Sequence, residues 1–137
     1  MESDFLLKAF TRDFEVNGPS VVRVARTTLK GWLRYRNYHD TRVRQRYSRE
    51  ARDLAVTYAS AVWASRRWFK SQPMLWEKST TVLRDIYRQF GFRARFTAPL
   101  AGRFVYQKLR REARRLREGW TYEPPTFYEK SIPCPEI

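Results

Sequence analysis

The sequence predicts an all-α fold, a bundle of about five helices followed by an extended C-terminal tail. Apolar residues recur at every third or fourth position over long stretches, which is the period of an amphipathic helix. Glycine and proline separate these stretches at residues 17–19, at residues 71–73 and at Gly91. No two segments make a convincing strand pair, and the chain has no internal repeat.

The first expected helix begins near Ser3 and Asp4, which can cap its N-terminus, and ends at Gly18. One apolar stripe along it is formed by Leu6, Ala9, Phe10 and Phe14. The second helix is expected over residues 19–38, and its apolar face carries Val22, Ala25, Leu29, Trp32 and Leu33. Gly31 lies inside this helix and indicates a close approach of another helix, although it is also tolerated at about 1 kcal/mol.

The third expected helix, residues 41–70, is the longest, and Asp40 is its N-cap. Its inward positions have a near-heptad spacing and are Val43, Tyr47, Ala51, Leu54, Tyr58 and Val62, followed by Trp68 or Phe69. Several alanines make the helix slim, so we expect it at the centre of the bundle: Ala55, Ala59, Ala61 and Ala64.

The fourth helix is expected over residues 74–90, with Leu75, Val82, Ile86 and Phe90 facing inward and Gly91 at its end. Residues 92–98 are expected to be a short link. The fifth helix then covers residues 99–118, its inner face carrying Leu100, Phe104 or Val105, Leu109, Ala113 and Leu116. Residues 1–119 therefore form the helical bundle. Residues 120–137 form an extended tail, in which helix is excluded by Pro124, Pro125, Pro133 and Pro135.

The formal net charge is +14, and a field of that size attracts polyanions. Most of the basic residues are arginine, which suits bidentate phosphate contact but also follows from codon usage rich in arginine. Cys134 is the only cysteine and His39 the only histidine, so a disulfide within the chain or a multi-cysteine metal site is excluded. No apolar run reaches the roughly 18 residues of a membrane-spanning helix, and no signal peptide is evident. We therefore expect a cytoplasmic protein.

A polyanion-binding site is the first candidate for function. Seven basic residues on the fifth helix, with Glu112 as the only acid among them, could follow a phosphate backbone or lie on an anionic membrane surface: Arg103, Lys108, Arg110, Arg111, Arg114, Arg115 and Arg117. The alternative is a solvated helix face in a basic protein. Phe92 and Phe96 are the specific support for a membrane surface.

A catalytic site is not expected. His39 and Asp40 are neighbours in sequence that rarely aim at one point, and no serine or cysteine is placed beside them as a nucleophile. The basic cluster of residues 42–52 is interpreted as a charged helix face, partly neutralised by the pairs Arg46/Glu50 and Arg49/Asp53. The tryptophans at helical spacing are interpreted as core.

One stretch resembles the C-terminal helical region of cobalamin-binding radical SAM proteins. The matching parts are Arg12-Asp13-Phe14, Asn17-Gly18-Pro19-Ser20, Arg26-Thr27-Thr28-Leu29, Gly31-Trp32, Tyr35 and Asp40-x-Arg42-Val43-Arg44. The likeness extends more loosely over residues 5–120. In that family a cobalamin-binding domain precedes a barrel whose C-x₃-C-x₂-C cysteines hold a 4Fe–4S cluster that works with S-adenosylmethionine.

This chain lacks those parts, so no catalytic, cofactor-binding or metal-binding residue is carried over to it. The resemblance implies a detached or split C-terminal region, or a truncated reading frame. In the first case the chain is a non-catalytic accessory that packs on a radical SAM core supplied by another polypeptide, with the aromatic tail as a docking segment. The rival hypothesis is a small basic protein that binds RNA or DNA through residues 103–117. It is supported by the net charge of +14.

Overall fold

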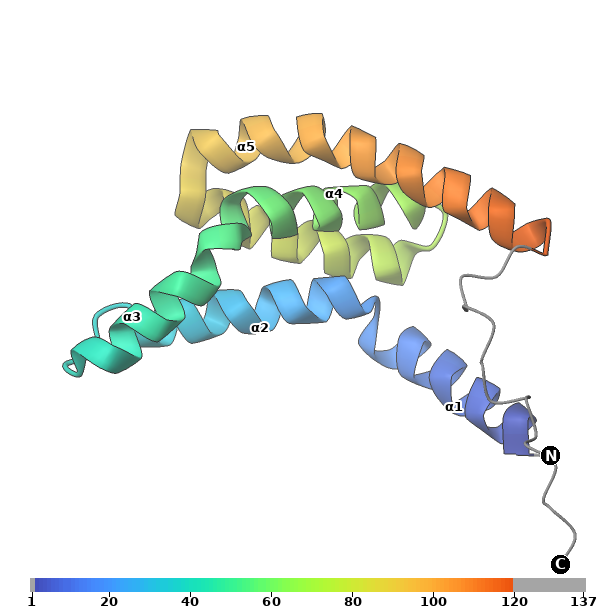
Figure 1. Ribbon diagram of the computed structural model, residues 1–137, viewed down its shortest axis with the longest axis horizontal. Coiled ribbons are helices and arrows are strands. Elements are labelled where there is room, and N and C mark those ends of the chain that lie inside the picture. The colour runs from blue at the N-terminus through green and yellow to red at the C-terminus, as the bar shows by residue number, and fades with distance from the viewer. Residues whose placement is uncertain (1, 120–137) are drawn as a thin grey trace, which may run out of the picture.

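The computed structural model describes residues 2–119, and these confirm an all-α fold in which every element is helical (Figure 1). The α-helices are α1 (Glu2–Asn17), α2 (Ser20–Tyr35), α3 (Thr41–Glu50), α4 (Ala59–Trp68) and α5 (Pro73–Arg117). A short 3₁₀ helix (Ala51–Asp53) and a π-helical segment (Leu54–Tyr58) join α3 to α4. The predicted tail, residues 120–137, lies outside the described residues.

Helix α5 is two antiparallel helices joined at Gly91, as the yellow and orange halves of the ribbon show in Figure 1. Gly91 has φ 56° and ψ −134°, a conformation open to glycine because it has no Cβ. The predicted helix end at Gly91 is therefore confirmed. The prediction of a link over residues 92–98 is wrong, because these residues are helical and Pro99 lies inside the second half. A helix can continue through a proline when it gives up one backbone hydrogen bond.

The turns between the first three helices form as the sequence indicates. Gly18 has φ 78° and donates its N–H to the carbonyl of Phe14 at 2.8 Å, which ends α1. The Asp40 carboxylate accepts the Arg42 N–H at 2.7 Å and so caps α3. Helix α2 ends at Tyr35, three residues earlier than the predicted boundary at residue 38, and α1 begins at Glu2, ahead of the predicted cap.

The predicted helix over residues 41–70 is helical for almost its whole length, but its winding changes at the centre. A π-helical turn leaves carbonyls without their usual partners. The Thr97 hydroxyl on α5 lies 2.9 Å from the carbonyl oxygen of Ala55 and can donate to it. The change of winding thus lies where the chain meets the second half of α5.

The core is built around the π-helical segment and α4, which both halves of α5 and then α2 cover (Figure 1). The largest fully buried side chains are Leu54, Val62, Leu83 and Ile86, with Ser79 beside them. The expected central alanines Ala55, Ala59 and Ala64 are buried, which lets the neighbouring helices approach closely. Helix α4 is therefore the central element, as its alanine content predicts.

The predicted inner face of the fifth helix is wrong at most positions. On the second half of α5 the buried residues are small (Ala94, Ala98 and Gly102), whereas Leu100, Phe104, Leu109 and Leu116 are exposed. The alternative Val105 and the predicted Ala113 are partly buried. On α1 the apolar stripe of Leu6, Phe10 and Phe14 is also exposed. In Figure 1, α1 projects away from the bundle, so most of its length has no neighbouring helix to cover that stripe. Both faces have the helical period, but the bundle does not use them.

Candidate interaction surfaces

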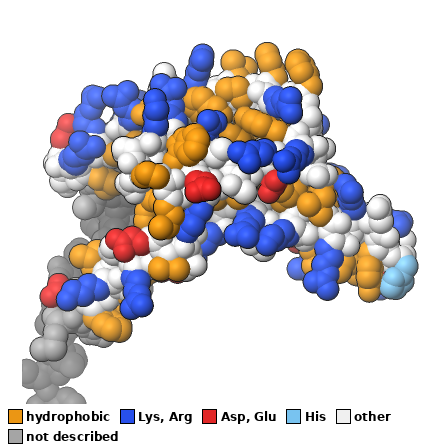
Figure 2. Space-filling model, turned by 180° about the vertical axis from the view of Figure 1, so that it is seen from behind, with side chains coloured by type: hydrophobic (Ala, Val, Ile, Leu, Met, Phe, Trp, Pro, Cys, Tyr) orange, Lys and Arg blue, Asp and Glu red, His pale blue; other side chains and the backbone are white. Residues whose placement is uncertain are grey.

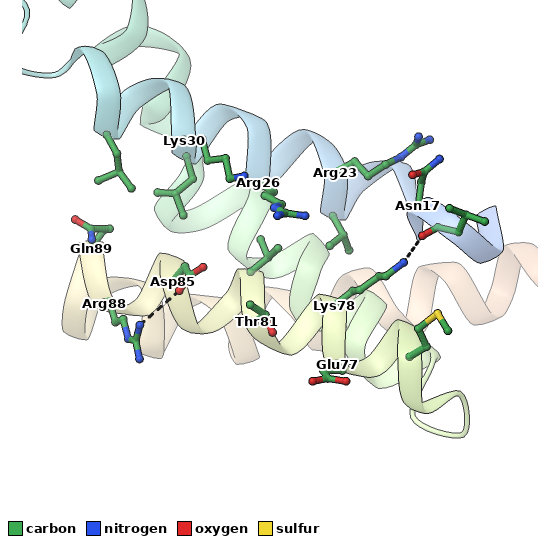
Figure 3. Close-up of a pocket in the computed structure, with 16 residues that line it drawn as sticks. Asn17, Arg23, Arg26, Lys30, Glu77, Lys78, Thr81, Asp85, Arg88 and Gln89 are labelled. Carbon is green, nitrogen blue, oxygen red and sulfur yellow. Dashed lines mark hydrogen bonds and ion pairs between the residues drawn. The ribbon is translucent and has the colours of Figure 1, made fainter. Parts of the chain in front are cut away.

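A groove of about 720 Å³ runs between α2 and the first half of α5 (Figure 3). Its floor is apolar and includes the buried side chains of Val22, Leu29 and Val82. Its rim carries charges of both signs: Arg23, Arg26 and Lys30 from α2, and Glu77, Lys78, Asp85 and Arg88 from α5. Among the described residues, no histidine or cysteine lines the groove.

Two contacts lie at the ends of this groove. The Lys78 ammonium donates to the carbonyl of Val16, which ties the end of α1 to α5, and Figure 3 shows Lys78 reaching towards that end of the groove. At the other end, the Asp85 carboxylate and the Arg88 guanidinium form an ion pair at 3.8 Å. The charges on the α5 side are thus partly engaged with the protein, while Arg26 and Lys30 on the α2 side have no acidic partner among the described residues.

A second hollow, of about 420 Å³, lies on α3 beside the end of α2, and its lining is rich in hydrogen-bond donors. It is lined by Arg36, Arg44, Gln45, Ser48, Arg49 and Arg52. Arg44 donates to the Tyr38 carbonyl at 3.3 Å, and Arg36 donates to Gln89 Oε1 at 3.4 Å. The surface predicted to be a charged helix face is therefore exposed as expected, but it also forms a shallow basic concavity.

The predicted pairing that would neutralise this face forms only in part. Arg46 and Glu50 make the expected ion pair at 3.3 Å. Arg49 and Asp53 are not joined by an ion pair in the described part of the chain, because the 3₁₀ turn at residues 51–53 changes the register between them. The face keeps more positive charge than the sequence alone indicates.

All seven predicted polyanion-binding residues lie on the second half of α5, but the structure brings only some of them together. Arg110, Arg114 and Arg117 line one hollow of about 320 Å³. Arg115 is half-buried and forms an ion pair with Glu112 at 3.5 Å, whereas Arg103, Lys108 and Arg111 are exposed elsewhere on the helix. The candidate site therefore narrows to one face near the end of α5.

Trp68 and Tyr106 complete this hollow. The prediction of Trp68 as a core residue is wrong, because its side chain is 38% exposed and lines this hollow instead. Their rings meet edge to face with centroids 6.1 Å apart, and the Arg67 guanidinium lies 5.1 Å from the Tyr106 ring centre. Tyr106 lies one helical turn before Arg110, so its place on the same face could be found from spacing. Trp68 comes from α4, and its contact with α5 depends on the reversal at Gly91.

The remaining candidates for chemistry do not assemble into a site. The His39 ring packs against the Tyr38 ring at 4.3 Å, and Asp40 is engaged as the cap of α3. Over residues 2–119, no three or more histidine, cysteine, aspartate or glutamate side chains come together as a metal site would require. Cys134 lies outside the described residues. None of the helices in residues 2–119 combines the length and apolar character needed to cross a membrane.

In comparisons with protein-family models, with curated proteins and with solved structures, no match to this chain was found.

Proposed function

We propose that this chain is a non-catalytic helical accessory region, related to the C-terminal region of cobalamin-binding radical SAM enzymes, that packs on a catalytic core through α1. The observation that carries the proposal is the apolar face of α1, where Leu6 is 50%, Leu7 66% and Phe10 71% exposed. Contiguous exposed apolar surface of this kind is typical of an interaction site. Full burial of such a side chain stabilises a complex by about 1.5–3 kcal/mol.

The stretch that carries the family resemblance also sets the direction in which α1 leaves the bundle. Asp13 forms an ion pair with Arg23 of α2 at 3.1 Å, and the Phe14 ring lies 5.5 Å from the Phe69 ring. Together with the Gly18 turn, these contacts anchor the end of α1. The anchored end leaves the first turns of α1 available to a partner, which supports the interpretation of α1 as a docking element.

The test begins with the reading frame that adjoins this one in the genome. We expect it to encode a barrel with C-x₃-C-x₂-C, and we expect the two polypeptides to co-purify when expressed together. Phe10→Asp should abolish co-purification, because it places a charge in the apolar face. Phe104→Asp is the matched control, with similar exposure on α5, and should leave co-purification intact. The absence of a radical SAM core in the adjoining frames would refute the proposal, as would equal behaviour of the two variants.

A second candidate function, binding of single-stranded nucleic acid, is supported by the hollow that joins Trp68 and Tyr106 to three arginines. Such sites combine aromatic rings, on which bases stack, with cations that contact the phosphates. In this reading Arg110, Arg114 and Arg117 contact the backbone while Tyr106 offers its ring to a base. This function needs no partner protein, so its test is independent of the first.

A further inference from the structure

A row of large apolar side chains runs along the outside of the second half of α5. Phe92, Phe96, Leu100 and Phe104 recur every four residues and are 82%, 59%, 64% and 69% exposed. The Phe92 and Phe96 rings stack with centroids 6.0 Å apart. Figure 2 shows hydrophobic side chains gathered along the upper edge of the molecule, where α5 lies, with Lys and Arg side chains beside them. We refer to these four residues as the α5 ridge.

The bundle itself does not require this ridge. The buried residues of this half of the helix are the small ones, Ala94, Ala98 and Gly102, and Gly102 lies against Trp63 and Ser60 of α4. A helix with a small-residue inner face could carry polar residues on its outer face and still fold. Four exposed apolar side chains in one row, in place of scattered ones, indicate that something covers them.

The charge around the ridge is entirely positive along the sequence. Between Asp85 and Glu112 there is no acidic residue, and both of these acids are already paired, with Arg88 and with Arg115. Exposed cations interleave with or follow the ridge: Arg93, Arg95, Arg103, Lys108, Arg110 and Arg111. The ridge thus combines aromatic side chains with guanidinium groups that have no nearby acid in sequence.

This combination fits the surface of an anionic bilayer. Aromatic and aliphatic side chains enter the boundary between headgroups and acyl chains, while arginines beside them meet lipid phosphates. Insertion between lipids requires no complementary groove.

We propose that the second half of α5 is a contact for anionic membrane surfaces, in which the α5 ridge inserts and Arg93, Arg95 and Arg103 bind lipid phosphates. The helix lies on the membrane and does not cross it. This inference goes beyond the proposed function and uses a different face of the molecule, since docking on a catalytic core depends on α1.

The test is co-sedimentation of the whole chain with vesicles, at physiological ionic strength. Vesicles of phosphatidylglycerol and phosphatidylcholine should bind the protein, and vesicles of phosphatidylcholine alone should bind it at least tenfold more weakly. The double variant Phe96→Ser/Phe104→Ser should lose about tenfold or more in affinity for the anionic vesicles, because two apolar side chains no longer insert. The variant Arg93→Gln/Arg95→Gln should also lose about tenfold, and its residual binding should no longer favour anionic lipid.

The matched control is Phe5→Ser/Phe10→Ser, which removes two equally exposed rings from α1 and should bind anionic vesicles as the wild type does. Because all these side chains are exposed, each variant should keep the helical circular dichroism and melting temperature of the wild type. The proposal is overturned if the ridge variant sediments like the wild type. It is also overturned if the α1 variant loses as much binding, or if neutral vesicles bind equally well. Loss of co-purification with a catalytic core by the ridge variant alone would assign the ridge to a protein partner instead.

Discussion

Gly102 lies where the second half of α5 packs closely against α4. A Cβ atom at this position would lie 2.6 Å from Cε3 of Trp63 and 3.1 Å from the backbone oxygen of Ser60. Neither an indole ring in contact with the core nor a helix backbone moves easily, so the helices would have to separate.

We predict that Gly102→Ala lowers the free energy of unfolding by about 1–3 kcal/mol, the usual effect of overpacking, even though alanine favours helix. Urea unfolding followed by circular dichroism measures it. The neighbouring exposed change Arg103→Ala is the control, and its effect should stay within about 0.5 kcal/mol. A stabilised Gly102→Ala protein would mean that the two helices do not meet as closely as described here.

Tyr87 gives the protein a pH dependence in the alkaline range. Burial raises the pKa of its phenol above the usual value, while Arg66 and Arg95 lower that pKa in part. The folded protein therefore keeps this proton to a higher pH than the unfolded chain does. As pH rises past about 10, the unfolded state ionises first and is favoured, so stability is full below this pH and falls above it.

Tyr87→Phe should remove the part of the alkaline loss of stability that Tyr87 causes, because phenylalanine does not ionise. We predict that the difference in unfolding free energy between wild type and variant is constant below about pH 9 and shifts in favour of the variant as the pH rises above about 10. All other side chains are the same in both proteins and cancel in the comparison. Parallel stability curves across the whole range would contradict the prediction.

At the scale of elements, Gly91 divides α5 into its two antiparallel halves. Its φ of 56° with ψ of −134° is a conformation that other residues rarely adopt, although there is open space where a Cβ would lie. The barrier to substitution is therefore backbone strain and not a clash. We predict that Gly91→Ala lowers the free energy of unfolding by about 1–3 kcal/mol.

The matched control is Gln89→Ala, an exposed change in the same turn that should have little effect. Thermal unfolding of both variants at one concentration gives the comparison. If Gly91→Ala is as stable as Gln89→Ala, the reversal at Gly91 does not need a glycine. A straight α5 in place of the reversal would appear as an increase in the radius of gyration by small-angle scattering.

The sequence predicted elements well where a local signal marks them. Gly18, Asp40 and Gly91 have side chains or backbone freedom that act within a few residues, so the turns they mark could be found without a structure. The inner face of the fifth helix could not be found this way. Which residues of this helix are buried depends on how closely the neighbouring helices approach it. The small residues Ala94, Ala98 and Gly102 are buried, whereas larger residues that recur with the same helical period are exposed.

The candidate sites, too, could be predicted from the sequence only where a single helix forms them. The basic residues of the fifth helix are visible in the sequence, but their grouping into one hollow depends on Trp68, which arrives from α4. The groove between α2 and α5 joins residues more than fifty positions apart, and no periodicity within either helix reveals it. The exposure of α1 could not be predicted either, because an apolar stripe has the same pattern whether a neighbour covers it or not.

At the scale of the whole molecule, the net charge of +14 guarantees some attraction to any polyanion, so a binding site must be distinguished from the general field. The structure provides two separate basic hollows with three exposed arginines available in each for comparison. One hollow, near the end of α5, contains the aromatic rings of Trp68 and Tyr106, and the other, on α3, contains none. Equal changes of charge at the two hollows therefore distinguish binding at one hollow from attraction to the total charge of the protein.

We predict that single-stranded RNA or DNA binds at the α5 hollow with an affinity that falls steeply as salt rises. Changing Arg110, Arg114 and Arg117 to glutamate should abolish binding at physiological salt. Changing the same three to glutamine should lower the slope of log affinity against log salt by about 2, since each phosphate contact contributes about 0.7 for single strands. Tyr106→Ala should weaken binding by about 1–3 kcal/mol with the slope unchanged, because stacking is lost but no cation is.

The control changes Arg36, Arg49 and Arg52, the exposed arginines that line the other hollow, in the same ways and so alters the net charge equally. It should lower affinity only slightly, because the general field is weakened while the α5 hollow is intact. Fluorescence anisotropy with a labelled oligonucleotide over a salt series measures all of these variants. If the two triple variants lose affinity equally, binding follows net charge alone and the α5 hollow is not a nucleic-acid site.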